Sequence, residues 1–195
     1  MKLVTIKADS IKYLTISLPK PTPEMVRKYR ERTSEHMNRV RKNLKKIAKK
    51  YGKRVKDQPY TNPENLSRRG LLHDKSKYSD MERIPCIWLT WYHYKKNKGE
   101  DFTYPPGVER VVKKANRHHV NTNRHHPEYH ASPTDMTYED LSEMVADWAA
   151  MSQELGTSLK GWVKSNLKNW DFKNEDKRFI NELVSMFDSG GSDNV

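Results

Sequence analysis

The chain has 195 residues, and its 37 lysines and arginines against 25 aspartates and glutamates give it a formal net charge of +12. This length suits one domain with a hydrophobic core, and the basic excess favours anionic partners: nucleic acid, nucleotides or other phosphorylated small molecules. One cysteine excludes an internal disulfide, and no apolar run approaches the ~18 residues of a membrane span, so we expect a cytoplasmic protein without a membrane partner.

The N-terminal part of the chain divides into an arm and a long helix. Residues 1–20 alternate weakly between apolar and polar side chains, which predicts a short β hairpin or an irregular arm. A helix is expected over 23–51, because Thr22 can cap it and Pro23 suits its first turn. Gly52 can end this helix.

Two features of the 23–51 helix bear on function. His36 falls on its inward-facing apolar stripe, where a histidine is either a satisfied core residue or a metal ligand. Basic residues crowd into 27–56, which is typical of the solvated face of a long helix. A nucleic-acid surface is the alternative, although neither interleaved aromatic residues nor a recognised binding motif accompanies this run.

A short helix is expected over 64–73. Leu71 and Leu72 near its end are predicted to be buried, and they are followed at once by His73 and Asp74. The pair would therefore present an imidazole and a carboxylate side by side at the end of the helix.

An aromatic-rich segment around 80–98 is predicted to be helical, followed by a loop over 99–107. The next helix is expected over 108–119. His119 shares the apolar face of this helix and should point inward, while His118 lies about 100° away around the helix axis.

The stretch 118–126 holds four of the eight histidines of the chain. It leads into a long polar segment over 120–137 that includes His125 and His126. Imidazole is the commonest protein ligand for transition metals, so the stretch indicates a metal site; a histidine-rich surface loop is the alternative.

A helix over 138–155 is the clearest of the later elements. Asp140 near its start is expected to cap it or to favour its dipole. Asp147 lies mid-helix beside apolar residues, where a carboxylate suggests either a salt bridge to a lysine or a metal ligand. One last helix is expected over 158–187, and residues 189–195 are expected to be a disordered tail.

Taken in chain order, the candidate ligands resemble the pattern of the HD-domain superfamily of metal-dependent phosphohydrolases: His36, His73-Asp74, His119, His125 or His126, and Asp147. Residues 71–77 are similar to the His-Asp-x-x-Lys form found in the branch with two-metal members. The combination of 118–128 with 143–148 is similar to an uncharacterised subgroup from phages and bacteria. The resemblance covers 24–155 and implies an all-α, HD-domain-like helical bundle, which we place over 21–188.

The resemblance also implies a ligand set. One ion would be held by His36, His73, Asp74 and Asp147. Asp74 would bridge to a second ion that His119 and either His125 or His126 complete. Mixed imidazole and carboxylate ligands suit Mn, Fe, Co, Ni or Mg, among which the sequence does not choose.

Asp74 and Lys77 are the expected catalytic residues, with Lys77 neutralising a substrate phosphate unless it is a solvated lysine. His118 and Arg124 are further candidates for phosphate contact or proton transfer. The expected function is hydrolysis of a phosphoester bond in a nucleotide or related compound by a metal-activated water. The alternatives are an HD-type nuclease, a di-iron oxygenase, or a basic nucleic-acid-binding module without activity. A cyclic-dinucleotide phosphodiesterase is not expected, since no glycine-rich continuation follows His119.

Overall fold

The computed structural model describes residues 18–56 and 58–188, and every regular element in these ranges is a helix, which confirms the all-α fold. The α-helices of this part of the chain are, in order, α1 (Pro23–Tyr51), α2 (Pro63–Leu72), α3 (Arg83–Asn97), α4 (Val108–Thr122), α5 (Tyr138–Leu155), α6 (Leu159–Asn166) and α7 (Asn174–Asp188). Four short 3-10 helices accompany them: η1 (Lys75–Tyr78), η2 (Pro127–Tyr129), η3 (Pro133–Asp135) and η4 (Leu167–Asn169).

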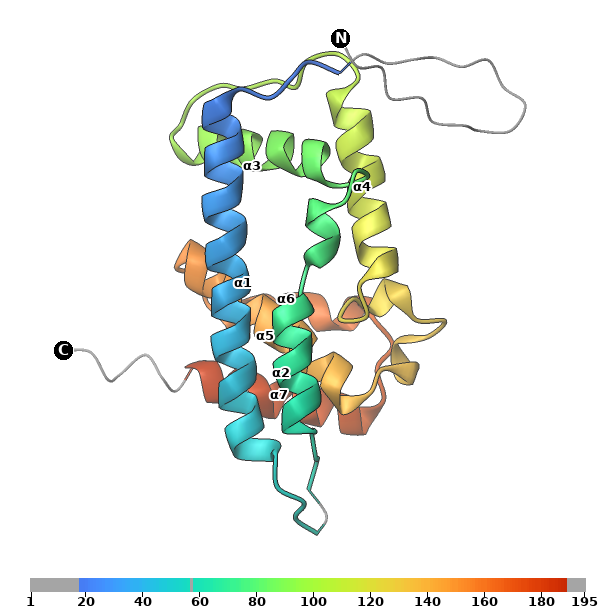
Figure 1. Cartoon of the computed structure of the whole chain (residues 1–195). Helices are drawn as coiled ribbons and strands as arrows, with labels where there is room; N and C mark the ends of the chain where they lie inside the picture. The colour runs from blue at the N-terminus through green and yellow to red at the C-terminus, as the bar shows by residue number, and fades with distance from the viewer. Residues whose placement is uncertain (1–17, 57, 189–195) are drawn as a thin grey trace, which may run out of the picture.

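The first helix is the longest element and runs the height of the molecule (Figure 1). It begins as predicted, because the Thr22 side chain accepts a hydrogen bond of 3.3 Å from the backbone of Met25 and Pro23 occupies the first turn. It ends before Gly52, also as predicted. At 1.5 Å per residue its 29 residues span about 44 Å, so α1 can pack against elements at both ends of the fold.

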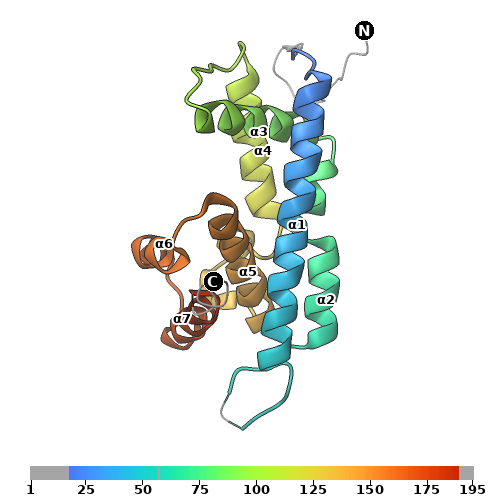
Figure 2. The same ribbon diagram turned by 90° about the vertical axis from the view of Figure 1, so that its left-hand side faces the viewer.

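Two separate hydrophobic clusters pack against the two halves of α1. The N-terminal half contributes Met25 and Tyr29 to a cluster completed by α3 and α4. The C-terminal half contributes Val40, Leu44 and Ile47 to a larger cluster completed mainly by α5, α6 and α7. Figure 2 shows these two groups of helices one above the other along α1. His36 therefore lies on α1 between the two clusters.

The second helix packs closely against α1 and leaves part of its end exposed. Leu66 and Gly70, one turn apart, are its buried residues, and a side chain at Gly70 would lie 3.3 Å from a methyl group of Leu44. The predicted burial of the two residues that follow is wrong: Leu71 is 57 % exposed and Leu72 is 51 % exposed. Because 66 and 70 define the inner face of this short helix, positions 71 and 72 turn outward.

Two helix boundaries differ from the sequence-based prediction. The α4 helix continues to Thr122, three residues beyond its predicted end. The single helix predicted over 158–187 is wrong, because the chain breaks into α6, η4 and α7. Phe172 lies between η4 and α7 and is buried in the larger hydrophobic cluster, which an uninterrupted helix would not permit.

The ends of the chain fall largely outside these ranges. The predicted arm is described only at 18–20, which form no regular element, and the predicted tail over 189–195 lies outside the described residues. Among the helices of the described ranges, none combines the length and the apolar character that crossing a membrane would require.

Candidate metal centre

The predicted ligands come together in one cluster at the level of His36, between the two hydrophobic clusters. Five segments deliver them: α1 carries His36, the end of α2 carries His73 and Asp74, α4 carries His119, the segment after α4 carries His125 and His126, and α5 carries Asp147. Three overlapping groups of these side chains have ligand atoms within 4.8 Å of one another: His36, His73 and Asp74; His73, His125 and Asp147; and His119, His125 and His126. Each group could hold a metal ion.

The carboxylate of Asp74 lies between two sets of imidazoles. Its Oδ2 atom is 3.6 Å from Nε2 of His36 and 3.5 Å from Nε2 of His73. Its Oδ1 atom is 3.2 Å from Nε2 of His119 and 3.6 Å from Nε2 of His125. The two oxygens of one carboxylate therefore face two different pairs of nitrogen atoms, which is the arrangement of a ligand that bridges two ions.

The backbone at Asp74 is unusual. Its φ of 56° and ψ of 19° place it in the left-handed region, and no other non-glycine residue of the described ranges has a positive φ. Aspartate tolerates this conformation better than most residues, and the conformation turns the chain from the end of α2 into η1. Such backbone strain is concentrated at functional sites in proteins.

Asp147 supplies the second carboxylate from the middle of α5. Its Oδ1 atom lies 3.0 Å from Nε2 of His36 and 3.6 Å from Nε2 of His73, while its Oδ2 atom lies 3.9 Å from Nε2 of His125. The Nε2 atoms of His36 and His73 are themselves 3.3 Å apart. The Nε2 atoms of His36 and His73 thus lie between the carboxylates of Asp74 and Asp147, as the predicted first ligand set requires.

Both histidines between which the sequence left a choice belong to the cluster. The rings of His125 and His126 are 4.2 Å apart between centroids, and the His126 ring is 5.0 Å from that of His119. The Nε2 atoms of His125 and His126 and the Oδ1 atom of Asp74 are buried without a hydrogen-bond partner among the described residues. Burial of unpaired polar atoms is costly, so these atoms fit a bound cation better than an empty core.

A buried glutamate that the sequence did not single out orients two of the imidazoles. Oε1 of Glu143 lies 2.9 Å from Nδ1 of His73 and 3.4 Å from Nδ1 of His125. Arg69 holds the other oxygen of Glu143 at 3.0 Å. A carboxylate only accepts hydrogen bonds, so Nδ1 carries the proton at the 2.9 Å contact and Nε2 of His73 is left to face the centre. The four-residue spacing of Glu143 and Asp147 on one helix was the signal that could have identified it.

A second buried glutamate, Glu82 just before α3, orients the histidines of α4, on the other side of Asp74. Its Oε2 atom lies 2.9 Å from Nδ1 of His119, and its Oε1 atom lies 2.7 Å from Nδ1 of His118. The Ser76 hydroxyl donates to Glu82 over 2.9 Å. His119 therefore presents Nε2 to Asp74, whereas His118 is bound to Glu82 at the edge of the site. The expected inward direction of His119 is confirmed.

Lys77 lies at the edge of the cluster. Its ammonium group donates to Oδ2 of Asp74 over 2.5 Å. The hydroxyl of Tyr29 donates to the backbone oxygen of Lys77 over 2.7 Å, which anchors η1 to α1. The lysine is thus held beside the carboxylate of Asp74 and is not a freely solvated residue.

Arg124 takes a different place from the other candidates. Both of its guanidinium contacts with Asp140 measure 3.1 Å, and the group lies over the ring of Tyr129. Within the described residues these are its partners, and it contacts none of the clustered imidazoles. The expected role of Asp140 is confirmed, because it forms a capping box with Thr137 at the start of α5.

The charges in the cluster shift several pKa values strongly. Burial disfavours a charged His73, but the carboxylates of Asp74, Asp147 and Glu143 outweigh burial and raise its pKa to about 10. Burial likewise opposes charge on His119, whose pKa is raised to about 9 by Asp74 and Glu82. Burial and the neighbouring His125 lower the pKa of His126 to about 3. The neighbouring carboxylates thus favour protonated His73 and His119, whereas His126 favours the neutral form.

The donor set fits a divalent metal. Seven clustered side chains offer imidazole nitrogen and carboxylate oxygen, the mixture that suits Mn, Fe, Co, Ni or Mg, and the carboxylates of Asp74 and Asp147 supply the negative charge that a cation requires. The outer hydrogen bonds from Glu82 and Glu143 are of the kind that orients histidine ligands in known metal sites.

Comparison with known proteins gives one match. A family model described as "Family of unknown function (DUF5662)" matches residues 25–188, which include every residue of the cluster. No curated protein and no solved structure matches the chain.

Proposed function

We propose that this chain, which belongs to the DUF5662 family of unknown function, is a metal-dependent phosphohydrolase that cleaves a phosphoester bond of a nucleotide or a related phosphorylated compound. The observation that carries the proposal is the placement of Asp74, whose two oxygens face two separate pairs of imidazole nitrogens. A bridging carboxylate of this kind is what a two-ion hydrolytic site needs.

The ligands divide between two positions. His36, His73, Asp74 and Asp147 would hold one ion, and Asp74, His119, His125 and His126 would hold the other. Two such ions would lower the pKa of a water molecule and offset the negative charge of a phosphate during its displacement.

The side chains at the edge of the cluster would act on the substrate directly. Lys77 is placed to bind a phosphate oxygen once its ammonium group leaves Asp74 Oδ2. His118 is half-buried, and Glu82 accepts the hydrogen bond of its Nδ1, so its Nε2 would be available to accept a proton at the reacting group and to pass it on to a leaving group. The net charge of +12 favours the approach of an anionic substrate.

The proposal is tested by metal analysis of the purified protein, followed by a screen of nucleotides and phosphodiesters with Mn, Mg, Co and Ni. Asp74→Asn is the decisive variant, because asparagine tolerates the left-handed backbone while removing the charge. We expect it to lose bound metal and at least 100-fold in activity (about 2.7 kcal/mol). Asp80→Asn, the same change at an exposed position in the same segment, serves as the control.

Other outcomes of these measurements would identify other functions. Two iron ions with consumption of oxygen, and no release of phosphate, would indicate an oxygenase. Cleavage of DNA or RNA with steep salt dependence, in place of small substrates, would indicate a nuclease. Phosphate release that survives Asp74→Asn would contradict the proposal.

A further inference from the structure

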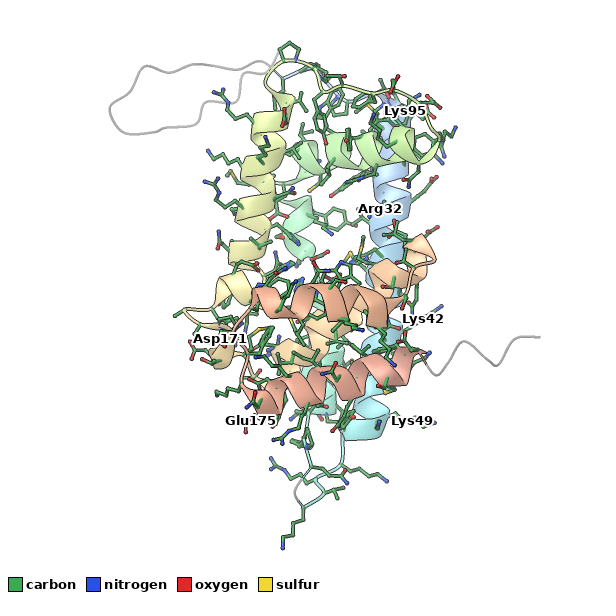
Figure 3. The ribbon with its side chains drawn as sticks, turned by 180° about the vertical axis from the view of Figure 1, so that it is seen from behind. Arg32, Lys42, Lys49, Lys95, Asp171 and Glu175 are labelled. Atoms are coloured by element: carbon green, nitrogen blue, oxygen red, sulfur yellow. The ribbon has the colours of Figure 1, made fainter. Side chains whose placement is uncertain are left out.

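Arg32 lies one helical turn from the candidate metal ligand His36. On α1 it precedes His36 by one helical turn, and its guanidinium contacts Met151, which follows Asp147 by one turn on α5. Residues one turn apart share a helix face, and His36 and Asp147 are in contact at 3.0 Å. The guanidinium of Arg32, which contacts Met151 and Glu154, therefore lies one to two turns of α5 beyond Asp147. Figure 3 shows Arg32 on α1 between the levels of α3 and α6.

The present partner of Arg32 leaves most of its donors unused. Its Nε atom donates to Oε1 of Glu154 over 2.5 Å, and among residues 18–56 and 58–188 its Nη2 atom has only the sulfur of Met151, at 3.9 Å. The second oxygen of Glu154 is buried with no hydrogen-bond partner among the described residues, so the pair is not bidentate. The Arg32 side chain is 34 % exposed. A guanidinium has five N–H donors, which leaves several for an anion.

The positive charges of Arg32 and Lys77 both affect the pKa of Cys86 on α3. Burial raises the pKa of the Cys86 thiol to about 11, and the positive charges of Lys77 and Arg32 both oppose that rise. Burial and the charge of Arg32 likewise lower the pKa of His93. Both Cys86 and His93 are on α3, the helix that packs against the N-terminal half of α1.

We propose that Arg32 forms an anion subsite next to the metal centre, and that the substrate carries a second phosphoryl group beside the one that is cleaved. The inference rests on the proposed phosphohydrolase function for the role of the metal centre. The reacting phosphate lies by Lys77, and the second phosphate takes the free donors of Arg32. Glu154 holds the guanidinium in position at the end of α5 and accepts one of its hydrogen bonds.

The test compares pyrophosphate with orthophosphate as ligands of the full-length protein in saturating Mg²⁺, by isothermal titration calorimetry. Wild-type protein is expected to bind pyrophosphate at least 10-fold more tightly than orthophosphate. Arg32→Met is expected to remove this difference while leaving orthophosphate binding unchanged. Arg39→Met is a matched control, since Arg39 is also on α1, is 32 % exposed and pairs with Glu35. If Arg32→Met is poorly folded, the double variant Arg32→Met with Glu154→Gln replaces it, because it leaves no unpaired carboxylate.

The subsite would be overturned if the wild type bound the two anions with equal affinity, or if Arg32→Met lost affinity for both anions equally. The Arg32–Glu154 ion pair would then be only a contact between α1 and α5. A difference retained in Arg32→Met would overturn the subsite too. Where a hydrolysed substrate is found, Arg32→Met is expected to raise KM more than it lowers kcat. A protein that discriminates the two anions through Arg32 but hydrolyses no phosphoester would retain the subsite and lose the proposed function.

Discussion

The orientation of three imidazoles in the cluster is set by a contact between the outer nitrogen of the ring and a glutamate. Glu143 holds Nδ1 of His73 and His125, whereas Glu82 holds Nδ1 of His119. The two glutamates therefore serve different parts of the site. Glu143 supports ligands on both sides of Asp74, while Glu82 supports only the side that His119 shares with His126.

This asymmetry predicts different metal stoichiometries for two equivalent substitutions. Glu82→Gln is expected to lower the affinity for the second ion, the one on the His119 side, by roughly 10–100-fold, so that the protein retains one ion at limiting metal. Glu143→Gln is expected to weaken both ions by a similar factor. Metal content after equilibrium dialysis, measured by inductively coupled plasma mass spectrometry, checks the prediction.

Glu154→Gln is the control for these variants, because Glu154 is also on α5 and forms an ion pair, but with Arg32 and not with a histidine. Its metal content should equal that of the wild type. The same loss in Glu82→Gln and Glu143→Gln would mean that the glutamates act on the fold in general and not on separate ions.

The histidines and Asp147 were accessible from the sequence, and the spacing of Glu143 from Asp147 offered a signal, whereas Glu82 had none. Helical periodicity gives the inward face on which His36 and His119 lie, whereas the expectation that they meet Asp147 came from the resemblance to the HD-domain pattern. Glu82 lies in a turn before α3, where no periodicity exists, and its partners come from α4. Its role depends on tertiary packing that local sequence does not encode.

At the scale of elements, the start of α5 is a junction of charged groups. Asp140 completes the capping box with Thr137 and also binds two arginines, Arg69 at 2.8 Å and Arg124 at 3.1 Å. Arg69 continues to Glu143, which holds His73. The N-terminus of α5 is thereby tied to α2 and to the segment that carries His125.

Asp140→Asn is expected to lower the free energy of unfolding at pH 7 by about 2 kcal/mol, since it weakens a buried, charge-assisted network. Although burial opposes it, Arg124, Thr137 and Arg69 lower the pKa of Asp140 in the folded protein. A carboxyl with a lowered folded pKa stabilises the fold above its unfolded pKa, near 3.9, and loses that contribution as the pH falls through the folded value.

The difference in free energy of unfolding between wild type and Asp140→Asn should therefore be constant from about pH 7 to pH 5 and shrink below about pH 4. Urea unfolding in the presence of a chelator measures it without a contribution from bound metal. Asp135→Asn, at a neighbouring position in η3, is the control. A difference that grows as the pH falls would contradict the assigned direction of the shift.

Helix boundaries show where periodicity stops being informative. The limits of α1 were predictable because Thr22, Pro23 and Gly52 act locally on the backbone. The break between α6 and α7 was missed because the apolar residues on both sides of it, and Phe172 within it, continue into one buried cluster. The outward direction of Leu71 and Leu72 was missed because the packing of α2 against α1, through Leu66 and Gly70, sets which face of this short helix is buried.

At the scale of the molecule, a polar, highly charged cluster separates two hydrophobic clusters. The ligands come from both sides of this division, because His119 belongs to α4 and Asp147 belongs to α5. A bound ion would therefore connect the two halves at a level where apolar packing is interrupted.

Metal binding is accordingly expected to stabilise the whole fold. An ion present at 100 times its Kd adds about 2.7 kcal/mol, which for a chain of this size raises Tm by roughly 5–10 °C. Differential scanning calorimetry with Mn²⁺ and with a chelator checks the shift. Asp74→Asn should show little of it, and an identical Tm for wild type with metal and with chelator would contradict metal binding at this centre.

The long first helix has a consequence for how the protein opens. Because α1 contributes Met25 and Tyr29 to one hydrophobic cluster and Val40 and Leu44 to the other, neither cluster can unfold alone without exposing one end of an otherwise intact helix. Amide protons in the middle of α1 should therefore exchange with solvent only through global unfolding. The short η1 segment has no buried residue of its own, so its amide protons can exchange through local fluctuations. Entry of a ligand would therefore displace η1 at the edge of the site, while the middle of α1 stays folded.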